Sequence, residues 1–165
     1  MVQMTVHTLV VDSAGQPVLV LRPMAEGPGP AVLLPIWIGP AEAAAILVAV
    51  EASPVPARPM SYDLMARLLE ASRAAVVRVE ISRIEQGTFY ATLTLDTPDG
   101  IREIDARPSD SIALAVRVRA PIFVADEVLD AAGVRPGDAE EGDRESEMEK
   151  FHEFLEGVDP DDFRG

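Results

Sequence analysis

The chain has 165 residues, of which 48% are hydrophobic and 25% are charged, as is typical of a globular protein rather than a disordered one. It contains no cysteine, which excludes disulfides, thiolate metal sites and a cysteine nucleophile. Residues 138–165 hold twelve acidic and three basic residues and so carry most of the net charge of −14. Neither this acidic segment nor the rest of the chain has the basic footprint of a tight nucleic-acid binder.

The first half of the chain begins with three predicted strands and a helix. The strands are expected over residues 2–11, 17–23 and 32–38, and the helix over residues 41–52. The apolar run over residues 31–50 is long enough to cross a bilayer, but Pro35, Gly39 and Pro40 interrupt it. We therefore expect a buried strand and a buried helix, with no membrane partner. The N-terminus lacks the pattern of a signal peptide, so a cytoplasmic protein is expected.

The second half is predicted to alternate further strands with helices. The strands are expected over residues 76–84, 89–96, 101–106 and 122–124. The helices are expected over residues 62–72, 109–118 and 126–132. Ser61 and Ser109 are predicted N-caps and Gly133 a predicted C-cap. On the first of these helices, Leu64 and Leu68 belong to an apolar face.

Strands in runs, broken by helices without strict alternation, predict the α+β class. We expect one domain over residues 1–137, with a multi-stranded antiparallel or mixed sheet flanked by helices. Residues 138–165 form a separate acidic tail, predicted as a C-terminal amphipathic helix with an apolar stripe on Met148, Phe151, Leu155 and Val158. The stripe and the apolar run over residues 31–50 predict a homo-oligomer, most simply a dimer.

Histidine offers no obvious general base. His7 alternates with strand residues and His152 lies in the acidic tail, so hydrolysis would more plausibly use metal-activated water. Asp105, Asp110 and Asp63 are the candidate catalytic carboxylates, and Asp105 with Asp110 would hold Mg²⁺ or Mn²⁺. Each of the three also has a structural interpretation, as a helix-dipole partner or an ion-pair partner of an arginine.

Two arginine–proline pairs, Arg58–Pro59 and Arg107–Pro108, stand immediately before predicted helix starts. Two helix N-termini, each flanked by an arginine, would make a site for an anion. Chance repetition of a common dipeptide is the alternative. The aromatic residues Trp37 and Tyr90 are interpreted as core or sheet-face residues rather than as platforms for nucleobases.

Several segments resemble the bifunctional nuclease domain family. The run DARPSDSIALA over residues 105–115 matches the family's strongest motif, LPIWIG over 34–39 matches a second, and RPMSYDL over 58–64 matches a third. The segment GTFYATLTL over 87–95 and the acidic tail are also similar to the family. The resemblance covers roughly residues 1–137.

The resemblance implies a nuclease acting on DNA or RNA as a transient partner. Arg107 and Arg58 would then bind phosphate, while Ser109, Ser111 and Tyr62 would complete the substrate-binding residues. Tyr62 stands where the family commonly has histidine, and a phenol with a pKa near 10 is a poor base at neutral pH. The alternative is a non-catalytic oligomeric interaction or ligand-sensing module, in which the same residues form an anion pocket or an ion-pair network.

Overall fold

The fold was analysed in a computed structural model that describes residues 1–25, 31–51 and 57–135. The predicted acidic C-terminal helix and the tail of residues 138–165 lie outside these ranges. Residues Met1–Val134 form one compact unit. Within the described ranges, no helix is long and apolar enough to cross a membrane.

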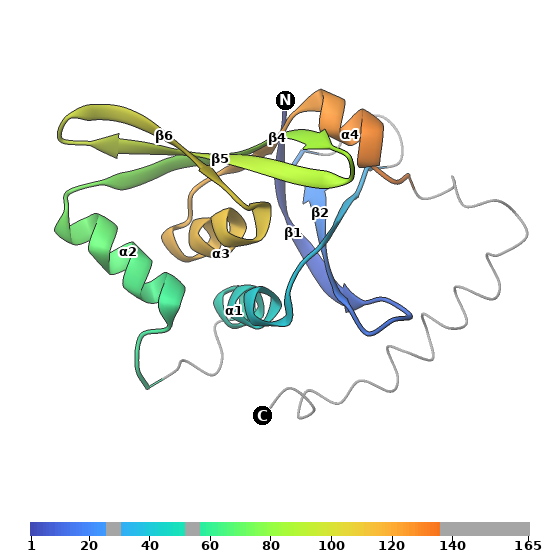
Figure 1. The fold of residues 1–165 in the computed structure, drawn as a ribbon, viewed down its shortest axis with the longest axis horizontal. Coiled ribbons are helices and arrows are strands. Elements are labelled where there is room, and N and C mark those ends of the chain that lie inside the picture. The colour runs from blue at the N-terminus through green and yellow to red at the C-terminus, as the bar shows by residue number, and fades with distance from the viewer. Residues whose placement is uncertain (26–30, 52–56, 136–165) are drawn as a thin grey trace, which may run out of the picture. The chain divides into compact units, whose positions relative to one another are not determined.

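Seven strands form a single curled sheet (Figure 1). They are β1 (Val2–Val11), β2 (Pro17–Pro23), β3 (Leu34–Trp37), β4 (Ala75–Glu85), β5 (Thr88–Thr97), β6 (Gly100–Ala106) and β7 (Ile122–Val124). Their order across the sheet is β3-β2-β1-β7-β4-β5-β6. All neighbours are antiparallel except β4 and β7, which run parallel. The sheet is therefore mixed, and β7 joins two antiparallel meanders.

The helices are α1 (Pro40–Glu51), α2 (Ser61–Ala71), α3 (Pro108–Val118) and α4 (Asp126–Ala132). Figure 1 shows α1, α2 and α3 grouped together on one side of the sheet, with α4 apart from them. Helix α3 contacts α1, α2, β4 and β5, and is the central helix of this group. Its residues from Ser111 to Ala115 are all buried, because the Ile112 and Leu114 side chains pack into the main hydrophobic core.

The α+β class and the mixed sheet were predicted correctly, and every described element lies within two residues of its expected position. Two caps differ, since Met60 rather than Ser61 precedes α2 and Arg107 rather than Ser109 precedes α3. The predicted apolar face of α2 is only partly buried: Leu64 and Leu68 are exposed, whereas Tyr62 at the start of the helix is buried in the core.

Two chain segments bring the functional residues together. The last residue of β6, Ala106, is followed directly by Arg107 and α3, and β3 is separated from α1 only by Ile38 and Gly39. Arg107 at the start of α3 bonds to Glu42 in the first turn of α1, so these two helix starts lie side by side. The polar residues at these two helix starts form the candidate site.

Candidate functional site

Arg107 is the centre of a charged cluster at the start of α3. Its Nε atom donates to Asp110 Oδ2 at 2.6 Å, and its Nη2 atom donates to Asp110 Oδ1 at 3.1 Å and to Glu42 Oε1 at 2.7 Å. Asp110 lies on α3 and Glu42 on α1, so the guanidinium bridges the two helices. The hydrogen bonds and charges of the two carboxylates raise the pKa of Arg107, which keeps it cationic. Its side chain is nevertheless 66% exposed, so it remains accessible to a ligand.

Tyr62 supplies a third hydrogen bond to Asp110, in addition to the two from Arg107. Its hydroxyl donates to Asp110 Oδ1 at 2.6 Å, which connects α2 to α3. Burial raises the pKa of Tyr62, and the neighbouring Asp110 carboxylate raises it further, so the phenol is protonated at neutral pH. Burial alone would raise the pKa of Asp110, but the hydrogen bonds from Arg107 and Tyr62 outweigh this and lower it. The cluster therefore holds an ionised carboxylate between a cation and a neutral hydroxyl donor.

Asp63, although next to Tyr62 in sequence, faces a different arginine. Its Oδ1 atom accepts from Arg117 Nε at 2.8 Å, and its Oδ2 atom accepts from the Met60 backbone N–H at 2.8 Å. The Met60 hydrogen bond, followed by the Arg117 hydrogen bond, lowers the pKa of Asp63. Arg117 also lies over the Tyr62 ring, 5.4 Å from its centroid. Asp63 thus caps α2 and fastens it to α3, which supports the structural interpretation of this residue.

Asp105 lies on the opposite face of the sheet from α3. It pairs with Thr92 across the β5–β6 ladder, whereas the adjacent residue Ile104 pairs with Leu93, a core residue. Since side chains alternate between faces along a strand, Asp105 points away from Asp110. The structure therefore does not bring together the two carboxylates expected to share a metal ion.

The donor set at the start of α3 does not fit Mg²⁺ or Mn²⁺. Both oxygens of Asp110 accept hydrogen bonds from protein donors, and Glu42 Oε1 accepts from Arg107. Hard divalent cations need several free oxygen ligands around them. Among the residues that the structure describes, no three His, Asp or Glu side chains gather in a way that could hold a metal ion.

The remaining predicted site residues divide into accessible and inaccessible ones. Ser109 lines a cleft beside Arg107, whereas the Ser111 hydroxyl is buried without a hydrogen-bond partner in the described part of the chain. A buried hydroxyl at this position cannot contact a substrate. Arg58 is exposed and makes no salt bridge with any residue of the described ranges. Only Arg107, Asp110, Tyr62 and Ser109 therefore lie around one location.

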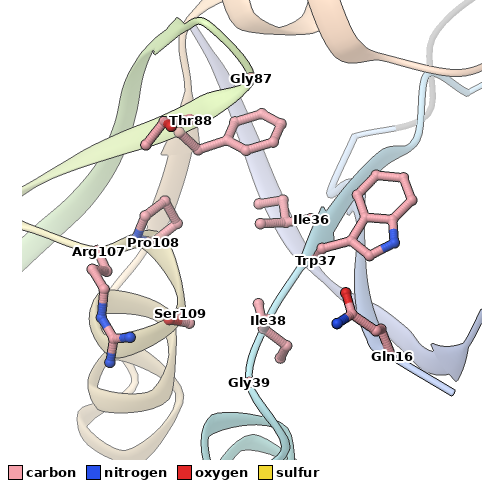
Figure 2. A pocket seen from close by; sticks show the side chains of 11 residues that line it. Gln16, Ile36, Trp37, Ile38, Gly39, Gly87, Thr88, Arg107, Pro108 and Ser109 are labelled. Carbon is pink, nitrogen blue, oxygen red and sulfur yellow. The ribbon is translucent and has the colours of Figure 1, made fainter. Parts of the chain in front are cut away.

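The cleft beside the cluster has a volume of about 490 Å³. Figure 2 shows Arg107, Pro108 and Ser109 on one side of it, with Ile36, Trp37 and Ile38 on the other. Its lining comes from the start of α3, from β3, from the β4–β5 turn and from Gln16 before β2. The cleft thus lies between two segments, residues 34–39 and 105–115, whose sequences match separate motifs.

Trp37, which was interpreted as a core or sheet-face residue, stands on the rim of this cleft. Its side chain is 57% exposed, because it follows the buried Ile36 on β3 and so points to the other face. The indole Nε1 donates to Asp12 Oδ2 at 2.9 Å. Asp12 also accepts from the backbone N–H groups of Ala14 and Gln16 at 2.9 Å each. The ring is therefore held in position although it is exposed.

Sequence reasoning missed Glu42 and Trp37 as candidate site residues. Glu42 lies in the first turn of its helix, where the helix dipole is enough to explain a carboxylate, and no local pattern indicates that its partner lies on α3, far along the chain. A signal for Trp37 was available: in LPIW, the apolar residues Leu34 and Ile36 alternate with Pro35 and Trp37. Period-2 alternation places Trp37 on the face opposite to the core residues.

Comparison with known proteins gives a family and three relatives. The profile of the bifunctional nuclease domain matches residues 20–137. Uncharacterised proteins from two strains of Mycobacterium tuberculosis are each 45% identical over 161 residues, covering 94% of this chain and 93% of theirs. A protein of Oryza sativa subsp. japonica named bifunctional nuclease 2 is 31% identical over 130 residues, covering 76% of this chain and 38% of the rice protein.

Proposed function

Because this chain belongs to the bifunctional nuclease domain family, we propose that it hydrolyses phosphodiester bonds of DNA or RNA. The observation that carries the proposal is the position of Arg107. Its guanidinium is exposed, is anchored by carboxylates on two helices and stands beside an open cleft. An arginine held in this way binds phosphate with little loss of side-chain freedom.

Arg107 has donors left over for a substrate. Its Nε and Nη2 atoms bond to Asp110 and Glu42, whereas Nη1 has no hydrogen-bond partner in the described ranges. The two N–H groups of Nη1 are free to donate to a phosphate oxygen, and charge-assisted hydrogen bonds of this kind are strong. In the transition state these donors would stabilise the additional negative charge on the phosphoryl oxygens.

Asp110 is the proposed general base. It is ionised at neutral pH, because the donors around it lower its pKa. In the proposed step, a water oxygen attacks phosphorus, Asp110 accepts the proton of that water, and the bond from phosphorus to the leaving sugar oxygen breaks. The leaving oxygen takes its proton from solvent. A lowered pKa makes Asp110 a weak base, which predicts slow turnover.

Tyr62 is proposed to orient Asp110 rather than to transfer a proton. Its raised pKa keeps the phenol neutral, so it donates to Asp110 Oδ1, which also accepts from Arg107 Nη2, while Oδ2 accepts from Arg107 Nε. The sequence predicts a divalent cation, but the described residues at this site provide no set of ligands for one. No step of the proposed reaction therefore uses a metal ion, and Mg²⁺ and Mn²⁺ are tested in the assay instead.

A second function is favoured by the hydrogen bonds that Asp110 already makes. Both of its carboxylate oxygens accept from protein donors, as expected of an ion-pair network that fixes α1, α2 and α3 to one another. In this alternative the protein is a non-catalytic interaction or ligand-sensing module, and Arg107 binds an anion without cleaving it.

The two functions are separated by a nuclease assay on single- and double-stranded DNA and RNA, with Mg²⁺, with Mn²⁺ and with a chelator. We expect Arg107→Ala and Asp110→Asn to lower the cleavage rate by at least 10²-fold, the scale of one lost transition-state donor or base. Asp105→Asn and Asp63→Asn are expected to cut at nearly the wild-type rate, because neither carboxylate faces the cleft.

Matched controls guard against a contaminating nuclease and against unfolding. Asp130→Asn and Arg22→Ala make the same chemical changes at exposed positions outside the cluster and are expected to retain full activity. If the wild-type protein cuts no substrate, or if Asp110→Asn and Arg107→Ala cut as fast as it does, catalysis at this cluster is refuted. Retained binding of an anion by Arg107 would then support the module.

A further inference from the structure

We propose that the cleft binds one unpaired nucleotide of single-stranded nucleic acid, with its base stacked on Trp37 and its phosphate at the start of α3. This inference takes the substrate class from the proposed function and locates its binding site. Figure 2 shows the two parts of that site, Trp37 and Ser109, on opposite sides of the opening. Because β3 is the edge strand of the sheet, Trp37 lines the same cleft as the start of α3 although its side chain points away from the core face.

The indole of Trp37 is the stacking surface. It is the single tryptophan of the chain and is 57% exposed on the cleft rim. Its hydrogen bond to Asp12 fixes the ring by its edge, which leaves the flat face for another ring. Stacking of a base on an aromatic side chain is favourable whatever the base, and a ring that is already immobilised loses little entropy on binding.

The rest of the wall suits a flat, partly polar ligand. Phe89 and Ile36 supply apolar surface, and the Gln16 side chain supplies an amide, which can donate and accept hydrogen bonds. Two of the lining residues, Gly39 and Gly87, have no side chain, so a ligand can approach the backbone closely. The cleft therefore offers apolar and polar surface side by side, as a ligand with an apolar ring face and polar edges requires.

Ser109 and the backbone of α3 provide the phosphate end. Ser109 is only 7% exposed as a residue, and it lines the cleft. The residue preceding the helix, Arg107, makes no side-chain cap. The N–H groups of Ser109 and Asp110 therefore lack the cap that usually satisfies the first turn. A phosphate accepts from such N–H groups and from an adjacent hydroxyl.

The charges around the cleft limit the length of the ligand. Asp12, Asp110 and Glu42 would repel a long phosphate backbone, although Asp12 is engaged by Trp37 and the other two by Arg107. A duplex has its bases stacked internally and cannot offer a free base face to Trp37. The acidic residues and the need for a free base face together favour binding of one exposed nucleotide over extended binding along a duplex.

Because no other tryptophan is present, the intrinsic fluorescence of the protein reports on this site directly. The probe is a short oligothymidylate with cleavage-resistant phosphorothioate linkages, compared with an abasic oligomer of equal length and with a duplex. We expect the oligothymidylate to quench Trp37 fluorescence saturably, and the abasic oligomer and the duplex to quench it little.

Variants test the two halves of the site by anisotropy of a labelled oligothymidylate. Trp37→Ala is expected to weaken binding roughly 5- to 150-fold, the range of one lost base–aromatic stack, and Trp37→Phe to recover part of the loss. Ser109→Ala is expected to weaken the binding of both the oligothymidylate and the abasic oligomer. The control Ile101→Ala removes an equally exposed apolar side chain from β6 and is expected to bind normally.

The inference is overturned if the oligothymidylate fails to quench Trp37, if the abasic oligomer binds equally well, or if Trp37→Ala binds as wild type. A fluorescence change that depends on protein concentration alone would identify a second copy of the chain as the occupant and would also overturn it. Quenching without any cleavage would contradict the proposed catalysis but not this site. Cleavage by Trp37→Ala with an unchanged KM would contradict this binding site but not the proposed catalysis.

Discussion

Tyr62 takes part in two contacts that hold α2 against α3. Its hydroxyl bonds to Asp110 and its ring lies under Arg117, which in turn holds Asp63. The Tyr62 side chain is thus buried and neutral. An imidazole at this position could exchange a proton near neutral pH, whereas this phenol cannot.

We predict that Tyr62→Phe lowers the free energy of unfolding by roughly 1–2 kcal/mol, because it removes a hydrogen bond to a partly buried carboxylate. Urea denaturation of Tyr62→Phe, Asp110→Asn and the double variant measures the coupling between the two residues. Strictly additive losses would mean that the 2.6 Å contact contributes nothing to stability.

A second prediction concerns acid. The pKa values of Asp63 and Asp110 are both lowered in the folded protein from the ordinary 3.8, so each ionised carboxylate stabilises the fold above about pH 4 and loses that effect as the pH falls through its folded-state pKa. We expect Asp63→Asn to be less stable than wild type near pH 7, with the difference shrinking below about pH 4. The measurement is thermal unfolding of both proteins from pH 7 to below pH 4. A stability difference that stays constant with pH would contradict the prediction.

At the site, sequence reasoning named Arg107 and Asp110 as candidate residues because both belong to one local motif, but it did not predict that they pair with each other, as they do in the structure. It failed for Asp105, whose direction depends on strand register: a shift of one residue would have turned its side chain to the helix side. It also failed for Glu42, which reaches Arg107 only through the packing of α1 on α3. Contacts set by tertiary packing leave no local pattern in a sequence.

Among the elements, the strands and helices were predictable because turn residues separate segments of clear period. Gly15, Gly87 and Gly100 adopt positive φ angles at the turns between neighbouring strands, a conformation that glycine reaches at no steric cost. The place of β7 was not predictable. Three residues, Ile122–Val124, insert between β1 and β4, and so short a segment carries no indication of its two partners.

Gly133, which ends α4, allows a close contact that any side chain would prevent. A Cβ atom there would lie 2.5 Å from Val32 Cγ1 and about as close to the Leu129 carbonyl oxygen, at 2.4 Å. We predict that Gly133→Ala destabilises the protein by about 1–3 kcal/mol, the usual result of overpacking.

The matched control for this prediction is Gly39→Ala. There a Cβ would meet only the Glu42 side chain, which can rotate away at the cost of its ion pair with the exposed Arg107; since exposed ion pairs contribute about 0–1 kcal/mol, the loss of stability should be smaller. Chemical denaturation of both variants is the measurement. Equal losses would mean that the close approach of α4 to residue 32 is unimportant for the fold.

At the scale of the whole molecule, the exposed apolar side chains of α2 support the expected homo-oligomer. Leu64, Met65 and Leu68 are 53%, 45% and 60% exposed on neighbouring turns, and a contiguous patch of this kind commonly forms an interface. We predict that sedimentation yields a multiple of the 17.7 kDa chain mass and that Leu68→Glu shifts the protein towards monomer. Val77→Glu, at an exposed apolar residue on β4, serves as the control, and a wild-type monomer at micromolar concentration would refute the prediction.

The position of β7 in the sheet also has a consequence for how the chain folds during synthesis. The β1–β2–β3 and β4–β5–β6 meanders are each local in sequence, but β1 and β4 meet only through β7. A ribosome must therefore release almost the whole domain before the two halves can join, and until then β1 and β4 each have an unpaired edge. Such late, non-local closure slows folding, and it makes the nascent chain most vulnerable to misassociation just before residues 122–124 emerge.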